Sequence, residues 1–194
     1  MARWDPDAGG RLESAAIELI AQQGYAATTV PQIAERARVT TRTFFRYFTD
    51  KREVLFAGEE GLVDLFVELI DAAPPELPAM ATLEHALRAA AENYFEPRRE
   101  WMCRWREIIA GEPALRERGL SKQQSVVTAV VGSLGDRGVD RPDAELAAGI
   151  AFVVFQTAVA QWAAAATTQP LTSYLDASFS LMHQITARVD GLGA

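Results

Sequence analysis

The chain has 194 residues, of which 49% are hydrophobic and 23% charged, and its formal net charge is −7. This composition is that of an ordinary globular protein, and the length allows one core or a small head with a larger body. The one cysteine, Cys103, excludes an intramolecular disulfide, and the first residues, MARWDPDAGGRLES, lack the apolar stretch of a signal peptide. We therefore expect a protein of the reducing cytoplasm.

The first expected element is a helix from Ala8 or Arg11 to Gln23. Its apolar side chains recur at helical spacing and form one stripe, made of Leu12, Ala15, Ala16, Leu19 and Ile20. Gly24 suits the left-handed position that often follows the end of a helix. Because the stripe needs a partner, we expect this helix to brace the residues that follow it.

A second, shorter helix is expected to begin after Thr29. Thr29 and Gln32 fit a capping box, in which the hydroxyl accepts from the third backbone N–H and the amide reaches back. Pro31 falls in the first turn, where a missing N–H costs nothing. These signals place a helix start within a few residues.

Two further helix starts follow closely. Thr40 is a candidate N-cap, and Asp50 with Glu53 fits a second capping box. The first two short helices are joined by residues 38–41 only. This arrangement predicts a helix-turn-helix.

Positive charge is concentrated in and around this helix-turn-helix. Between residues 36 and 52 a single acid, Asp50, accompanies six basic side chains: Arg36, Arg38, Arg42, Arg46, Lys51 and Arg52. Residues 1–56 hold eight basic and seven acidic groups, whereas residues 57–194 hold eleven basic and nineteen acidic groups. The basic cluster therefore lies in the head, and the acidic body disfavours DNA binding elsewhere.

The second short helix is expected to turn Phe44 and Phe48 inward. It then presents polar, basic and aromatic groups outward, namely Thr41, Arg42, Thr43, Phe45, Arg46 and Tyr47. Such groups contact phosphates and base edges in a major groove. The sequence therefore predicts a DNA-binding face that includes the cap Thr40, and the alternative is a solvated basic face on a small helical bundle.

From about Arg11 to Phe56 the chain resembles the TetR (tetracycline-repressor) family of transcriptional regulators. The segments QQGY, TTV, IAERARV, TFFRYF and DKREVLF carry the resemblance, since their hydrophobic, capping and basic positions fall in the family's register. It implies an all-α fold with a three-helix DNA-binding head in residues 1–56 and an effector-binding and dimerisation domain in residues 57–194. It also implies a homodimer that binds double-stranded operator DNA and a small-molecule effector.

The resemblance also assigns roles to single side chains. Three match positions that contact phosphates: Thr29, Tyr47 and Lys51. Three match positions that face bases, Thr41, Arg42 and Arg46, and Thr43 matches the threonine of the recognition helix. Phe45 stands where the family usually has tyrosine, so a phosphate hydrogen bond is lost and an apolar contact to a thymine methyl is allowed. Arg38 stands where the joint usually has glycine, so either the arginine is strained or the turn differs.

The rest of the chain has the pattern of further helices. A fourth helix from Lys51 to about Ala73 would belong to both parts and act as a lever between them. Asp140 is expected to cap a later helix that has Pro142 in its first turn. The other expected helices cover residues 80–96, 98–111, 114–134 and 171–189.

Residues 146–175 contain no formally charged side chain. A segment of this length raises the alternative of a membrane helix. Polar residues interrupt it and no basic cluster flanks it, so a helix buried on several sides is the better interpretation, and no membrane partner is expected. The last two helices carry more apolar surface than one core needs, which predicts a homodimer through a four-helix bundle. The expected dimerisation residues are Phe152, Val159, Phe179 and Met182.

Aromatic side chains are frequent in the body. A core role is the simpler interpretation for each, and the alternative is that some line a cavity for an apolar or planar effector. Trp101 and Trp105 are the strongest candidates, because tryptophan is rarely used twice within about one turn as filler. The expected effector-binding residues are Phe66, Tyr94, Trp101, Met102, Trp105, Phe155 and Trp162.

Motifs for catalysis, cofactors or metals are not recognisable. The two histidines, His85 and His183, lie on separate expected helices, and neither a glycine-rich phosphate loop nor a nucleophile elbow occurs. We therefore expect no enzymatic activity, cofactor or metal, and the resemblance to the TetR family implies a ligand-responsive repressor. The alternatives are a helical small-molecule carrier without specific DNA binding, and a membrane-surface protein that uses residues 146–166.

Overall fold

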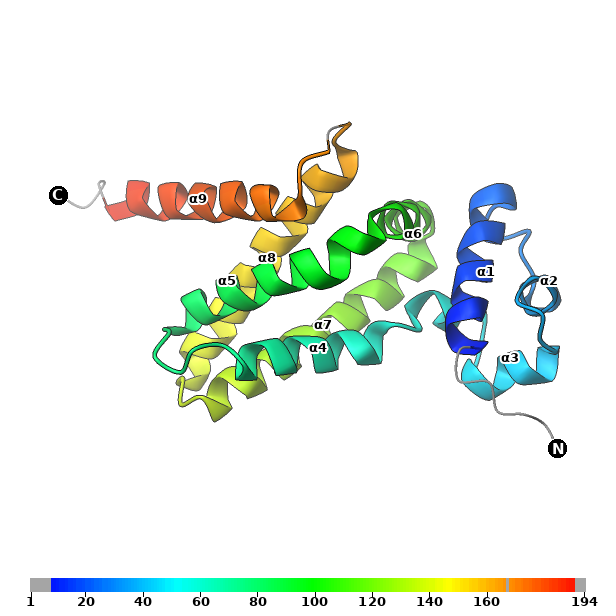
Figure 1. Ribbon diagram of the computed structural model, residues 1–194, viewed down its shortest axis with the longest axis horizontal. Helices are drawn as coiled ribbons and strands as arrows, with labels where there is room; N and C mark the ends of the chain where they lie inside the picture. The colour runs from blue at the N-terminus through cyan, green and yellow to red at the C-terminus, as the bar shows by residue number, and fades with distance from the viewer. Residues whose placement is uncertain (1–7, 167, 191–194) are drawn as a thin grey trace. The chain divides into compact units, whose positions relative to one another are not determined.

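The computed structural model describes residues 8–166 and 168–190, and every regular element in these ranges is helical (Figure 1). The chain divides into two compact units. The first combines Met1–Leu62 with Cys103–Gln123, and the second combines Val63–Met102 with Gln124–Ala194. The all-α fold expected from the sequence is confirmed. Each compact unit combines two separate stretches of the chain, whereas the expected domains are continuous in sequence. The expected domain boundary near residue 56 therefore stays a prediction.

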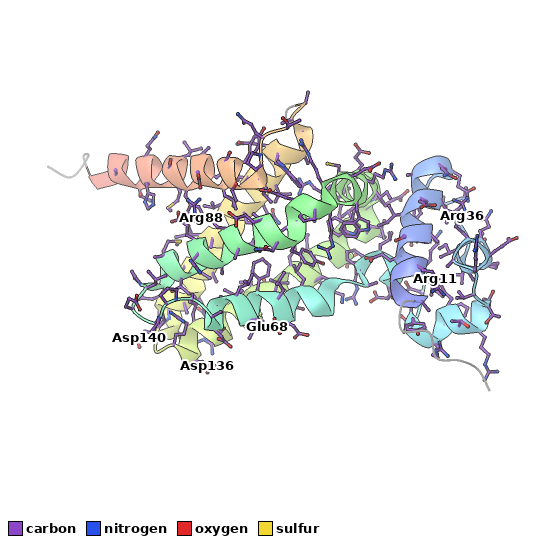
Figure 2. All side chains as sticks on the ribbon, viewed as in Figure 1. Arg11, Arg36, Glu68, Arg88, Asp136 and Asp140 are labelled. Atoms are coloured by element: carbon purple, nitrogen blue, oxygen red, sulfur yellow. The ribbon has the colours of Figure 1, made fainter. Side chains whose placement is uncertain are left out.

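The first unit begins with three helices, α1 (Ala8–Gln23), α2 (Val30–Arg36) and α3 (Thr41–Tyr47). Helix α1 packs on α2, which in turn packs on α3, and Leu12, Ile33 and Phe44 are each fully buried. Arg11 and Arg36, labelled in Figure 2, fix the same arrangement at its surface. Arg11 Nε donates to the carbonyl of Ala37 (3.3 Å), and Arg36 forms an ion pair with Glu18 (3.0 Å).

The capping signals act as the sequence predicts. The Thr29 hydroxyl accepts from the Gln32 backbone N–H (3.5 Å), and the Gln32 side chain accepts from the Thr29 N–H (2.9 Å). The Thr40 hydroxyl accepts from the Thr43 backbone N–H at 3.1 Å. Both helices therefore begin at residues that satisfy their otherwise unpaired N–H groups.

Arg38 occupies the left-handed conformation in the joint between α2 and α3. Its φ is 58°, and the Val39 N–H donates to the Ala34 carbonyl at 2.9 Å, which closes the end of α2 as a Schellman-type turn. The sequence left open whether Arg38 is strained or the turn differs, and the structure shows the strained arginine. A side chain in this conformation costs about 1 kcal/mol relative to glycine.

Replacing Arg38 by glycine is expected to raise the free energy of unfolding by about 0.5–1 kcal/mol, because glycine relieves this strain. Chemical denaturation of the two proteins measures the difference. Gly24→Ala is the opposite control, since Gly24 has a φ of 84° and alanine there should destabilise by a similar amount. An Arg38→Gly protein no more stable than the original would contradict the strain.

The expected fourth helix is interrupted. Residues Glu53–Phe56 form a 3₁₀ turn (η1), and α4 (Glu59–Asp71) begins only after Gly58. The expected second capping box is half formed: Asp50 accepts from the Glu53 N–H at 3.2 Å, but the Glu53 carboxylate binds Arg118 instead of reaching back. A partner distant in sequence therefore overrides the local capping signal.

The remaining helices are α5 (Ala79–Ala90), α6 (Arg99–Gly111), α7 (Pro113–Asp136), α8 (Arg141–Ala164) and α9 (Leu171–Asp190). A π-helical turn, η2 (Ala91–Phe95), and a 3₁₀ turn, η3 (Glu96–Arg98), carry the chain from α5 into α6. Pro97 thus changes the type of helix instead of ending it, since the wider turn precedes its ring. Three helices, α4, α6 and α7, contribute residues to both compact units.

In the second unit α8 packs against α5 and α9. Arg99 closes the end of α8, because its Nη2 donates to the carbonyls of Trp162 and Ala165, each at 2.9 Å. Arg88, labelled in Figure 2, joins α5 to α9 through an ion pair with Asp176. Asp140 occupies the expected N-cap position of α8, but its side chain forms no capping hydrogen bond, which corrects that part of the prediction.

Within the described residues, α8 is the one helix whose length and composition would allow it to cross a membrane. A core helix of a soluble protein passes the same test. α8 packs against two neighbours and buries Ala151, Ala158 and Trp162, and 39% of its apolar stretch is buried within the chain.

Candidate nucleic-acid interface and effector region

The outward face of α3 gathers the side chains suited to contact DNA. Thr41, Arg42, Phe45 and Arg46 are all exposed and recur at positions that share one face of a helix. Phe44, on the opposite face, is fully buried, and α3 packs against α2. Phe45 is 56% exposed, although its ring lies edge-on against Phe44 at 5.4 Å. The face therefore offers guanidinium, hydroxyl and apolar groups side by side.

Other members of the expected DNA-binding set lie at the borders of this face. Thr29 and Thr40 are exposed N-caps of α2 and α3, where a hydroxyl beside a helix start can meet a phosphate. Thr43 and Tyr47 are half-buried, and the Thr43 hydroxyl lies 3.0 Å from that of Thr40. Thr43 thus faces outward less than the sequence predicts, because it supports the cap.

Arg46 and Tyr47 contact each other. The guanidinium of Arg46 stacks over the Tyr47 ring at 5.0 Å, and its Nη2 donates to the Tyr47 hydroxyl at 3.3 Å. An exposed stacking contact of this kind contributes only about 0.5–1 kcal/mol, so DNA can compete for the arginine. The tyrosine thereby orders one of the two guanidinium groups of the face before DNA binds.

Lys51 is tied into the head more firmly than the sequence suggests. Its Nζ donates to the carbonyls of Tyr25 (2.6 Å) and Thr28 (2.7 Å) and lies 4.0 Å from the centre of the Tyr25 ring. Burial lowers the pKa of Lys51, and Glu112 opposes that shift. Lys51 therefore fixes the loop between α1 and α2 in addition to any phosphate contact.

Lys51→Ala is expected to lower the free energy of unfolding by about 1–2 kcal/mol, because two backbone carbonyls lose a charged donor. Arg52→Ala is the matched control, since Arg52 bonds to Asp50 and leaves those carbonyls untouched. If Lys51 also contacts a phosphate, the slope of log Kobs against log salt should fall by about one in Lys51→Ala. Unchanged stability would contradict the structural role.

Three of the seven expected effector-binding side chains meet in the second unit. Their ring centroids form a chain of close contacts. The centroids lie 6.4 Å apart for Phe66 and Phe155, 5.0 Å apart for Phe155 and Phe95, and 5.1 Å apart for Phe95 and Tyr94. Phe95 was outside the expected set, although its neighbour Tyr94 was in it. These four residues, Phe66, Tyr94, Phe95 and Phe155, form what we call the aromatic cluster.

The other four expected effector residues do not share one environment. Trp162 is buried beneath the guanidinium of Arg99, at 5.1 Å, and Met102 is buried in the same unit. Trp101 is half-buried and belongs to the second unit, whereas Trp105 belongs to the first. The Trp105 ring lies 6.0 Å from Phe56, and its Nε1 donates to the Leu55 carbonyl at 2.7 Å. Trp101 and Trp105, the two strongest candidates from the sequence, therefore belong to different units.

The structure distributes the four expected dimerisation residues between core and surface. Val159 and Phe179 are buried within the chain, and Phe152 and Met182 are half-buried. The exposed apolar side chains of the last two helices are Leu146, Ile150, Val153, Leu181 and Ile185. The first three follow the i, i+4, i+7 pattern on α8, and the last two follow i, i+4 on α9, so each set forms a stripe. We call these five residues the α8/α9 apolar face.

No group of three or more His, Cys, Asp or Glu side chains suited to a metal ion occurs in the described part of the chain.

A helix-turn-helix head with an outward basic face, joined to a helical body, defines a DNA-binding regulator. Residues 13–57 match the family of bacterial regulatory proteins called tetR, and residues 77–187 match the MftR C-terminal domain. The chain belongs to the TetR family of transcriptional regulators, a family of DNA-binding proteins without enzymatic activity.

Two curated relatives match the N-terminal region. The chain is 38% identical over 74 residues to the HTH-type transcriptional regulator TcmR of Streptomyces glaucescens, which is 38% of this chain and 33% of that protein. It is 40% identical over 57 residues to the HTH-type transcriptional regulator HbdR of Aromatoleum sp. (strain CIB), 29% of this chain and 25% of that protein. The match thus spans at most about a third of either relative.

Among solved structures, the chain is similar to Thermus thermophilus FadR, a TetR family transcriptional repressor crystallised in complex with lauroyl-CoA. The alignment covers 89% of this chain and 92% of that one, with 23% identity and a TM-score of 0.55. This likeness shows that the fold is shared.

Proposed function

We propose that this DNA-binding regulator is a ligand-responsive repressor, acting in the cytoplasm as a homodimer that leaves a near-palindromic operator when a small apolar or planar effector binds. The outward face of α3 is the observation that carries the proposal. Its exposed guanidinium, hydroxyl and phenyl groups are suited to base edges, and the flanking caps are suited to phosphates.

The α8/α9 apolar face supports the homodimer. Its five exposed aliphatic side chains would pack against the same residues of a second chain, as an isologous interface requires. Four helices, two from each chain, would then form a bundle. Such a dimer can present two copies of α3 to successive major grooves, about 34 Å apart on the operator.

The aromatic cluster supports an apolar or planar effector. Tyr94 and Phe155 are only half-buried, so part of each ring is accessible without unfolding the core. The lauroyl-CoA held by the Thermus thermophilus protein carries an apolar acyl chain on a phosphorylated carrier, and because the fold is shared it is a reasonable first probe. Trp101, Met102, Trp105 and Trp162 stay predictions as effector contacts.

Selection of genomic DNA fragments, followed by a gel shift, tests the proposal. A repressor should retain a discrete sequence with two related half-sites, and lauroyl-CoA or another effector from a panel should release it. Retention of all fragments equally, with affinity set only by salt, would contradict specific binding. A helical carrier without specific DNA binding, the alternative from the sequence, would give that result.

Arg46→Ala is expected to weaken binding to that operator by about 1–3 kcal/mol if Arg46 reads a guanine. Titration of the selected operator and of a scrambled duplex measures the loss on each. An equal loss on both sequences would instead assign Arg46 to a phosphate.

A further inference from the structure

We propose that residues 53–58 are a two-state joint, broken while the Trp105 indole and the Arg118 guanidinium hold the turn Glu53–Phe56, and continuous with α4 once they release it. The proposal deepens the regulatory function proposed above and rests on it for its biological meaning. It concerns a short segment between the DNA-binding helices and α4.

Several contacts hold the joint in its broken form. Arg118 grips the Glu53 carboxylate with two parallel hydrogen bonds, Nε to Oε1 at 2.7 Å and Nη2 to Oε2 at 2.8 Å. The Trp105 Nε1–H donates to the Leu55 carbonyl at 2.7 Å. Phe56 is buried, with the Trp105 ring edge-on at 6.0 Å. All these residues belong to the first compact unit.

The contacts come from the segment 103–123, which lies within the residues matched to the MftR C-terminal domain. This part of the C-terminal domain therefore packs with the head. A change in the C-terminal domain that shifts α6 or α7 would alter the grip on η1 directly. The joint therefore lies at the end of the residues matched to the DNA-binding domain and is held by residues matched to the C-terminal domain.

The Leu55 carbonyl explains why release would close the break. Leu55 is only 1% exposed, so its carbonyl cannot turn to water when the indole leaves. In a continuous helix the donor to residue 55 is the N–H of residue 59, four positions later. Glu59 is the first residue of α4, whose hydrogen-bond ladder starts with the Leu62 N–H donating to the Gly58 carbonyl at 3.1 Å. The N–H of a first helical residue has no partner within its own helix.

The backbone needs little rearrangement for this conversion. Arg52 and Ala57, at the two ends of η1, already have α-helical φ and ψ. A 3₁₀ helix rises about 2.0 Å and turns about 120° per residue, whereas an α-helix rises about 1.5 Å and turns about 100° per residue. Over the four residues of η1, the chain before residue 53 would approach α4 by about 2 Å and rotate by about 80°. Such a change would move the recognition helix relative to its operator half-site.

Three variants isolate the joint. Trp105→Phe removes the indole N–H but keeps an aromatic ring beside Phe56. Arg118→Gln removes the grip on Glu53, and Arg116→Gln is its matched control, because Arg116 lies on the same helix and donates to the Ala110 carbonyl at 2.8 Å. Glu59→Pro blocks the continuous form, because proline lacks the N–H and its ring would clash with the Leu55 carbonyl. Proline remains compatible with the observed first position of α4, so this variant should fold normally.

Amide hydrogen exchange in the full chain and titration of the selected operator form the test. In Trp105→Phe we expect at least tenfold slower exchange at residues 57–61 and about tenfold weaker operator binding. The double variant Trp105→Phe/Glu59→Pro should return operator affinity to within about twofold of the original, and Arg118→Gln should shift exchange in the same direction as Trp105→Phe. Arg116→Gln should change neither quantity.

Unchanged or faster exchange at residues 57–61 in Trp105→Phe would overturn the joint, as would weaker operator binding that Glu59→Pro does not restore. Trp105→Phe could instead reduce stability generally. That outcome would also speed exchange throughout the head, which overturns the proposal. If no discrete operator exists, the proposed function fails, and the exchange measurement still decides the joint.

Discussion

Replacing Val153 by aspartate is expected to convert the proposed homodimer into a folded monomer. Val153 is 62% exposed in the single chain and follows Leu146 and Ile150 in the exposed apolar stripe of α8. A carboxylate there costs the monomer little, but the dimer would bury it against aliphatic side chains without a partner. We expect the dimer dissociation constant to rise by at least about 100-fold, or about 3 kcal/mol.

Sedimentation velocity across a concentration series measures this change, and operator titration should show weaker binding in parallel. Leu120→Asp is the matched control, because Leu120 is 66% exposed but lies on α7 in the first unit. It should leave the association state unchanged. A Val153→Asp protein that stays dimeric with unchanged affinity would show that the chains associate elsewhere.

Glu13 is expected to make the stability of the protein depend on pH. This residue lies on α1, and its carboxyl group accepts from the backbone N–H of Gly58. Burial raises the pKa of Glu13 from 4.5 to about 7, and the hydrogen bond opposes that shift only in part. The folded protein therefore keeps a proton on Glu13 at pH values where the unfolded chain has lost it.

The sign follows from proton linkage. Below pH 4.5 both states hold the proton, and Glu13 does not affect stability. Between pH 4.5 and about 7 the folded state binds more protons than the unfolded state, so stability falls as pH rises. Above about 7 the loss is complete. It amounts to at most about 3 kcal/mol, since each pKa unit corresponds to about 1.4 kcal/mol.

Glu13→Gln is expected to remove this dependence, because the amide has no proton to lose and its oxygen can still accept from Gly58. Urea denaturation of both proteins at pH 5 and pH 8 measures it. The glutamine variant should gain about 2–3 kcal/mol relative to the original protein between the two pH values. If the free energies of unfolding of the two proteins changed equally with pH, a residue other than Glu13 would cause the pH dependence.

The sequence predicts the head accurately because its signals are local. Each start of α2 and α3 depends on a threonine and a partner three residues later, and the structure confirms both bonds. For Arg38 the sequence left two possibilities open, a strained arginine or a different turn, and the structure shows the left-handed conformation. Within this framework the outward position of Arg42, Phe45 and Arg46 follows from helical periodicity alone.

The apolar surface of α8 shows where local signals end. Leu146, Ile150 and Val153 recur at helical spacing, but so do the buried alanines of the same helix, since nearly every position is apolar. Periodicity cannot distinguish the inner stripe from the outer one in such a helix. Val159 and Phe179 were therefore expected at the dimer interface, whereas the structure buries them within the chain.

What the sequence by itself determined is the all-helical fold, the helix-turn-helix with its caps, and the basic character of the head. Tertiary structure alone decided the break before α4, the ties of Lys51 and the position of Trp105. The bonds from Trp105 to Leu55 and from Arg118 to Glu53 join residues 50 and 65 positions apart. Capping and periodicity extend over a few residues, so contacts at such separations exist only once the chain has folded.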